Sequence, residues 1–264
     1  MKISRLLALL TSFLYFGHVT AQTATVEVPD WALPGSPTHK QVPPPLDFHR
    51  QTKTEKKAIG IFQGQSDVGS ALVPGSSRFN PSNGQYTLVS AGYNIWYQRD
   101  EFRYIWKKMS GDVSLAADVA FPDTAGYNDR KAVLVIRQSL DDDSREAVVA
   151  LHGAGLIHLA WRPDSNQQMK EVRINRKNGH TVNNPGDSLD IGMARRIGIE
   201  KHGDVFAVFV SMHGEPMHQV GSTIQLPMDA PFYVGLGFCS HLPAKTDMAI
   251  LSNVVLENAA GKVR

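Results

Sequence analysis

Seven side chains of this chain have the types that recognise sugars. A sugar offers C–H faces that stack on planar rings, and hydroxyl groups that need hydrogen-bond donors and acceptors. The residues that combine these properties are Trp96, Asp100, Arg137, His152, Trp161, Arg162 and His241. Each also has a structural interpretation. Trp161 alternates in step with Ile157 and Leu159, which is typical of a core face, and Arg137 could pair with an acid of its own sheet.

Catalytic chemistry has weaker support in the pattern. Hydrolysis of a glycosidic bond needs two carboxyl groups roughly 5 to 9 Å apart across a sugar, which on a strand means acids spaced by two. A Gly-x-Ser-x-Gly nucleophile turn is absent, and the single cysteine lacks a catalytic signature. A hydrolase or lyase would have to use a less familiar set, and the candidates for it are Asp100, Arg137, Glu200 and His241.

Metal chemistry is not indicated either. Three histidines stand in His-Gly pairs between apolar runs, a combination typical of hairpin turns, and no pair of histidines has the spacing of a zinc site. We expect no cofactor and no catalytic metal. The acidic run Asp141, Asp142 and Asp143 could hold a structural calcium ion, or could be a solvated loop.

The first residues have the form of a secretory signal. Lys2 and Arg5 precede an apolar run from Leu6 to Phe16, and small residues follow up to Ala21. The run is shorter than the ~20 residues of a membrane span, so we expect cleavage and a secreted or periplasmic protein. Residues 1–21 contain two of the 27 basic residues and no acid, which leaves 25 basic and 25 acidic residues. This balance gives no electrostatic reason to expect nucleic acid as a partner.

The elements that must position these side chains are strands. Along Phe102 to Lys108 the aromatic residues occupy one face and Arg103 and Lys107 the other, which predicts one core face and one solvated face. The run 113–121 has a matching apolar face, and 110–112 reads as the turn between the two. Lys131 to Ile136 is apolar on both faces after its first residue, as in a central strand. Further strands are predicted at 147–151, 156–161, 196–200, 205–212, 232–239 and 248–256.

This pattern predicts one all-β domain of two packed antiparallel sheets. No helical periodicity and no fixed repeat interrupts the short apolar runs after Ile61. We predict a signal peptide at 1–21, a proline-rich arm at 22–58, the sandwich at 59–258 and a tail at 259–264. Cys239 cannot form an internal disulfide, because it is the only cysteine, and its apolar surroundings predict a buried thiol.

Between Ser66 and Glu257 the chain resembles a bacterial family of secreted concanavalin A-like domains. The family is often labelled Tol-type biopolymer transport protein and is related to the yeast regulator-of-enolase domain. The matching stretches are DVGSALVPGSSRFNPSNGQYTLVSAGYNIW, the D-x-F-x-Y-x-W-x-x-x-x-GD run at 100–112, KAVLVIRQS, RRIGIEKHGDVFAVFVSMHGEP and YVGLGFCSH followed by AILSNVVLE. The resemblance implies a concanavalin A-like jelly roll of the lectin and glucanase type, whose members mostly bind carbohydrate on the concave sheet or at its rim. Tyr97 departs from the family's usual tryptophan or glycine, and the Glu-x-Asp-x-x-Glu pattern of sandwich glucanases is absent.

Three hypotheses follow for the function. The first is a secreted, non-catalytic module that binds carbohydrate or another envelope polymer. The second is a glycan-active hydrolase or lyase, and the third is a structural envelope protein whose proline-rich arm docks a partner.

Overall fold

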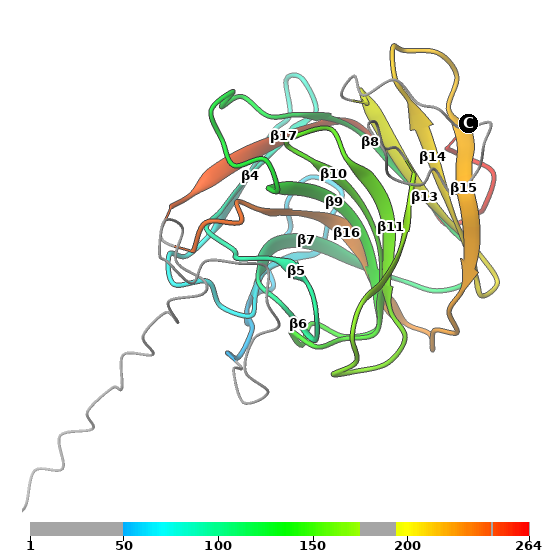
Figure 1. The fold of residues 1–264 in the computed structure, drawn as a ribbon, viewed down its shortest axis with the longest axis horizontal. Helices are drawn as coiled ribbons and strands as arrows, with labels where there is room; N and C mark the ends of the chain where they lie inside the picture. The colour runs from blue at the N-terminus through cyan, green and yellow to red at the C-terminus, as the bar shows by residue number, and fades with distance from the viewer. Residues whose placement is uncertain (1–49, 175–193, 244, 264) are drawn as a thin grey trace, which may run out of the picture.

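The computed structural model describes residues 50–174, 194–243 and 245–263. They form two antiparallel sheets packed face to face, with the strands of both sheets visible in Figure 1. The predicted fold class, an all-β jelly-roll sandwich, is confirmed. The predicted signal peptide and most of the proline-rich arm lie outside the described residues.

The eight-stranded sheet follows the order β1-β2-β7-β16-β9-β10-β11-β12. Its strands are β1 (Lys53–Glu55), β2 (Gly64–Val68), β7 (Phe102–Met109), β16 (Phe232–Cys239), β9 (Lys131–Arg137), β10 (Glu146–His152), β11 (Ile157–Arg162) and β12 (Lys170–Arg173). β9 is buried along its whole length, as its apolar sequence predicts. β1 falls inside the range expected for the arm, so the sandwich extends N-terminally of residue 59.

The seven-stranded sheet follows the order β15-β14-β13-β8-β17-β4-β3. Its strands are β15 (His218–Gln225), β14 (Val205–Ser211), β13 (Arg196–His202), β8 (Val113–Ala120), β17 (Asp247–Glu257), β4 (Gln85–Ser90) and β3 (Ser76–Asn80). A short hairpin of β5 (Ile95–Trp96) and β6 (Arg99–Asp100) pairs only with itself.

The main core lies between the two sheets. Alternate residues of each central strand enter it, among them Leu134 and Ile136 of β9 and Leu115 of β8, all without exposed surface. Trp161 packs against this core, as its alternation with Ile157 predicts. Cys239 is also buried, as expected, but it lies on the opposite face of the eight-stranded sheet.

That opposite, outer face carries a second apolar cluster. Phe102, Tyr104 and Trp106 belong to it together with Val133, and Ile95 of the β5–β6 hairpin covers them. Three expectations for this region are therefore wrong: a core that the aromatic face of β7 shares with β8, a hairpin turn at 110–112, and a solvated opposite face of β7. The aromatic face of β7 does not share a core with β8, because it points away from the seven-stranded sheet and Ile105 and Met109 of the other face enter the main core instead. Residues 110–112 cross between the sheets rather than forming a hairpin.

The face of β7 that carries Arg103 was expected to be solvated, but it is buried at this residue. Arg103 is only 3% exposed, because it pairs with Asp67 at 3.2 Å and donates to Ser77 Oγ at 2.8 Å. Alternation with a period of two shows which residues share a face, but it does not show which sheet the strand joins or what covers each face.

Candidate functional site

One end of the outer face of the eight-stranded sheet gathers polar side chains from four adjacent strands. Lys131 of β9 lies opposite His152 of β10, His158 follows on β11 and Glu171 on β12. Asp129, in the loop before β9, joins them beside His152. We call these five residues the polar row. Only Lys131 and His152 are direct cross-strand partners; His152 with His158, and His158 with Glu171, are diagonal neighbours on the same face, roughly 7 to 8 Å apart at Cβ and within reach of long side chains.

Contacts run along the row from one carboxylate to the other. Asp129 Oδ1 lies 3.6 Å from His152 Nδ1, which is an ion-pair distance rather than a hydrogen bond. His152 Nε2 lies 3.4 Å from His158 Nε2, and His158 Nδ1 lies 2.8 Å from Glu171 Oε2. All four ring nitrogens of the two histidines thus face a partner within the chain, whereas the Asp129 side chain is 40% exposed and that of Glu171 20%.

Burial sets the charges of the row. It lowers the pKa of His152 to about 3, so this imidazole is neutral at pH 7. The His152 side chain in turn holds the pKa of Asp129 at about 2, so this carboxylate remains ionised. Burial also lowers the pKa of Lys131, whose ammonium donates to Asn94 Oδ1. The Asp129 end of the row is therefore a fixed carboxylate acceptor.

Aromatic rings lie against the histidines. Trp96 of the β5–β6 hairpin stacks on His158 with centroids 5.7 Å apart and 14° between the planes. Tyr127 stacks on His241 at 5.1 Å and 4°, and Tyr93 lies 5.2 Å from the same imidazole. Trp96 and Tyr127 are half-buried, so part of each side chain stays accessible beside the row.

The other end of the same face holds a different arrangement, which we call the buried charge cluster. It consists of Asp100, Arg137, Glu146 and Arg162, and none of these side chains is exposed. Arg162 donates to both Asp100 oxygens at 2.6 and 2.7 Å, and Arg137 Nη2 lies 3.3 Å from Asp100 Oδ2. Burial raises the pKa of Glu146 to about 8. These contacts attach the β5–β6 hairpin to the sheet and leave no surface for a ligand.

The structure therefore divides the sequence candidates among four places. Trp96, His152 and His241 lie at the polar row, whereas Asp100, Arg137 and Arg162 form most of the buried charge cluster. Trp161 packs between the sheets, and Glu200 lies on the outer face of the seven-stranded sheet. Of the set considered for catalysis, Asp100 and Arg137 contact each other, with Arg137 Nη2 3.3 Å from Asp100 Oδ2.

Sequence reasoning missed Asp129, Lys131, His158 and Glu171. A signal for part of this set is present, because the apolar runs of three strands are bounded by polar residues at even spacing: Lys131 and Arg137, Glu146 and His152, His158 and Arg162. Even spacing places each pair on one face of its strand.

The acidic run after β9 pairs with arginine. Arg99 Nη1 lies 3.3 Å from Asp142 and 3.2 Å from Asp143, and Ser139 Oγ donates to Asp141 at 2.9 Å. Over the described ranges, no group of three or more His, Cys, Asp or Glu side chains is arranged to hold a metal ion. Structural calcium at this run stays a prediction.

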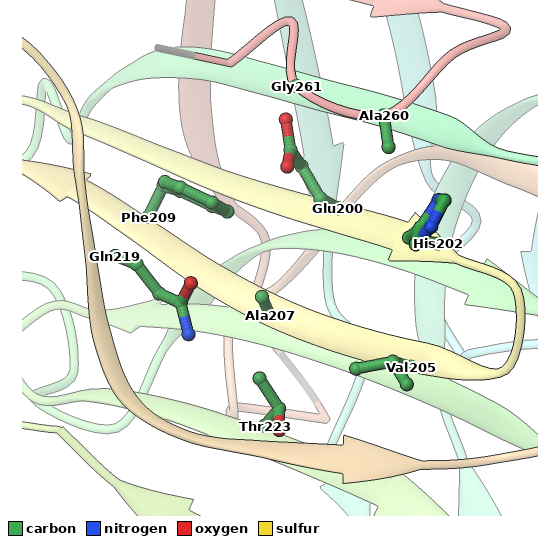
Figure 2. Close-up of a pocket in the computed structure, with 9 residues that line it drawn as sticks. All are labelled: Glu200, His202, Val205, Ala207, Phe209, Gln219, Thr223, Ala260 and Gly261. Carbon is green, nitrogen blue, oxygen red and sulfur yellow. The ribbon is translucent and has the colours of Figure 1, made fainter.

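A separate pocket of about 390 Å³ lies on the outer face of the seven-stranded sheet, and Figure 2 shows its side chains. We call it the outer pocket. Glu200 and His202 of β13, three residues of β14, two of β15 and the C-terminal segment surround it. Its lining consists of Glu200, His202, Val205, Ala207, Phe209, Gln219, Thr223, Ala260 and Gly261.

Comparisons with known proteins find similarity of structure and no similarity of sequence that would show a family. No protein-family model and no curated protein matches it. A functionally unknown protein from Saccharomyces cerevisiae is similar in structure, with a TM-score of 0.47 and 14% identity over 73% of this chain and 100% of that one. The carbohydrate-binding module CBM66 from Bacillus subtilis has a TM-score of 0.43 and 15% identity, over 70% and 92% of the two chains. An alginate lyase from Klebsiella pneumoniae has a TM-score of 0.43 and 13% identity, over 70% of this chain and 85% of that one.

These likenesses assign no ligand to this chain. The resemblance to the Tol-type family stays a prediction. In the part of the chain that the structure describes, no helix is long and apolar enough to span a membrane.

Proposed function

We propose that this protein is a secreted carbohydrate-binding protein and that it binds a sugar at the polar row. The observation that carries the proposal is the gathering of two partly exposed carboxylates, Asp129 and Glu171, with two half-buried rings, Trp96 and Tyr127, at one end of a sheet face. Carboxylates accept strong hydrogen bonds from hydroxyl groups, and the rings supply surface for C–H faces.

Binding fits this geometry better than proton transfer does. A general base or acid works best with a pKa near the operating pH, whereas the pKa of Asp129 is held at about 2 and that of His152 at about 3. His152 and His158 are 5% and 3% exposed, and their nitrogens face Asp129, Glu171 and each other.

Titration calorimetry with a panel of plant and bacterial polysaccharides tests the proposal. We expect binding, and we expect Asp129→Asn to weaken it about tenfold or more, because a charged acceptor becomes a neutral amide. Asp123→Asn is the matched control, since Asp123 lies in the same loop and accepts a bond from Ala125 N. Absence of binding across the panel, or an equal loss in both variants, would refute the assignment.

One observation favours a glycan-active enzyme as the second candidate. His158 links His152 to Glu171 through contacts of 3.4 and 2.8 Å, an arrangement along which a proton can move between the imidazoles and the carboxylate. Release of reducing ends or unsaturated products from the same panel, lost in His152→Gln, would establish this activity in place of simple binding.

Export from the cytoplasm is also part of the proposal, and it rests on the sequence of residues 1–21. Mass spectrometry of the protein exported by a bacterial host should find a mature N-terminus at Gln22. A protein that keeps Met1 and stays in the cytoplasm would contradict export.

A further inference from the structure

The outer pocket is a built feature of the seven-stranded sheet. The pairing of β14 with β15 shifts between Phe206 and Val208, so that three residues of β15, 221–223, lie opposite Ala207 alone. Gly221 allows this irregularity with a φ of +65°. The irregularity lies beside Ala207, and Thr223 of β15 lines the pocket there.

The C-terminal segment forms the opposite wall. Ser114 Oγ donates to the Ala259 carbonyl at 2.7 Å and accepts from Lys262 N at 3.1 Å, and Val263 packs in a small apolar cluster with Phe209. Val263 N donates to Glu200 Oε1 at 3.2 Å. These bonds hold the segment against the sheet, so the pocket has fixed walls on two sides.

The floor of the pocket is apolar. Val205, Ala207 and Phe209 alternate along β14 and therefore point to the same outer face. Phe209 is only 1% exposed, because Met217 and Val263 pack on it beside Gly198, so Val205 and Ala207 supply the accessible part of the floor. The result is a narrow apolar strip at the base of a hollow on the sheet.

Polar groups surround this strip. Glu200 is 7% exposed, its Oε1 accepts from Val263 N, and the same oxygen lies 3.0 Å from Ser114 Oγ, whose single proton can go either to it or to the Ala259 carbonyl. Among the described residues no donor reaches its second oxygen, Oε2. Figure 2 shows the Gln219 amide and the Thr223 hydroxyl on the far side of the strip, and His202 at the end of β13. The Gln219 amide both donates and accepts, as does the hydroxyl.

We propose that the outer pocket binds one sugar residue and is a second carbohydrate site, a step that rests on the proposed function. An apolar strip between hydrogen-bonding groups matches a pyranose ring, whose C–H face is apolar and whose edge carries hydroxyls. A buried carboxylate with one unbonded oxygen gains a charge-assisted bond when a hydroxyl donates to it. The volume of about 390 Å³ lies at the low end of the range for small-molecule sites.

The test uses saturation-transfer-difference NMR with the methyl glycosides of glucose, galactose, mannose, xylose and N-acetylglucosamine. All spectra are recorded on Asp129→Asn protein, so that the polar row contributes little. We expect a signal from at least one glycoside, and about a tenfold weaker affinity after Gln219→Ala or Thr223→Val. Ser222→Ala is the matched control, because Ser222 is an exposed neighbour on β15 that does not line the pocket.

The outcomes separate the two sites. If no glycoside binds the Asp129→Asn protein while polysaccharide binds the wild type, the outer pocket is not a sugar site and the proposed function stands. If the glycoside signal persists but is insensitive to Gln219→Ala, Thr223→Val and Glu200→Gln, the pocket assignment is wrong. Methyl glucosaminide is added to the panel as an ammonium probe: if it alone binds, and Glu200→Gln abolishes this binding, the pocket is an ammonium site and the sugar assignment is overturned.

Discussion

At the scale of single residues, burial decides which groups of the outer sheet face keep their charge. Glu101 illustrates this beside the polar row, where Tyr93 N donates to its Oε1 at 3.1 Å and Arg50 Nη1 lies 3.3 Å from its Oε2. Despite these favourable partners, burial raises the pKa of Glu101 to about 7. The folded protein therefore binds this proton more tightly than the unfolded chain does.

The Glu101 carboxyl predicts a specific dependence of stability on pH. An acid with a raised folded-state pKa contributes its full stability below its unfolded value, and loses it as the pH rises through the folded value. Relative to Glu101→Gln, which is always neutral, the wild type should lose up to about 3 kcal/mol between about pH 5 and pH 8. Guanidinium denaturation of both proteins across this range measures the difference. Glu257→Gln, at an exposed position of β17, should show a much flatter difference. A difference that grows in favour of the wild type would mean that the Arg50 ion pair outweighs burial.

At the scale of elements, the β5–β6 hairpin depends on the buried charge cluster rather than on a sheet ladder. Removing one member of a buried set leaves the others uncompensated, which costs about 3 to 5 kcal/mol. Arg162→Gln should therefore destabilise the protein by this amount, since Arg162 contacts Asp100 and Glu146 and also donates to the Ser144 carbonyl. Urea denaturation gives the value.

A surface pair supplies the comparison for that prediction. Arg145 lies 3.2 Å from Asp164, with side chains 25% and 57% exposed, and water screens such a pair, so its loss should cost far less than that of Arg162. Equal losses in Arg145→Gln and Arg162→Gln would show that the buried charge cluster does not hold the hairpin.

The same elements show how far prediction from sequence reaches. Strands such as β9, β10 and β16 were predictable because apolar runs of their length and composition are typical of buried strands. The polar row was not, because Lys131 and His152 become neighbours only through the register of β9 with β10. The role of Asp100 depends on Arg162, 62 residues away, and local alternation contains no information about such a contact.

At the scale of the whole molecule, the two proposed sites lie on opposite outer faces of the sandwich, since the polar row belongs to the eight-stranded sheet and the outer pocket to the seven-stranded one. One polysaccharide chain cannot easily reach both faces of a rigid domain, so a protein with two sites should bridge two chains. Mixing the wild-type protein with a polysaccharide that it binds should raise light scattering, because cross-linked chains form. Excess protein should lower the scattering again, because each protein molecule then binds only one chain. Asp129→Asn and Gln219→Ala should each still bind but fail to raise scattering, while Ser222→Ala should behave as wild type.

If either single-site variant scatters as strongly as the wild type, the bridging does not come from these two faces. If the wild type binds at both sites without scattering, the sites act on one chain and add affinity instead of cross-links.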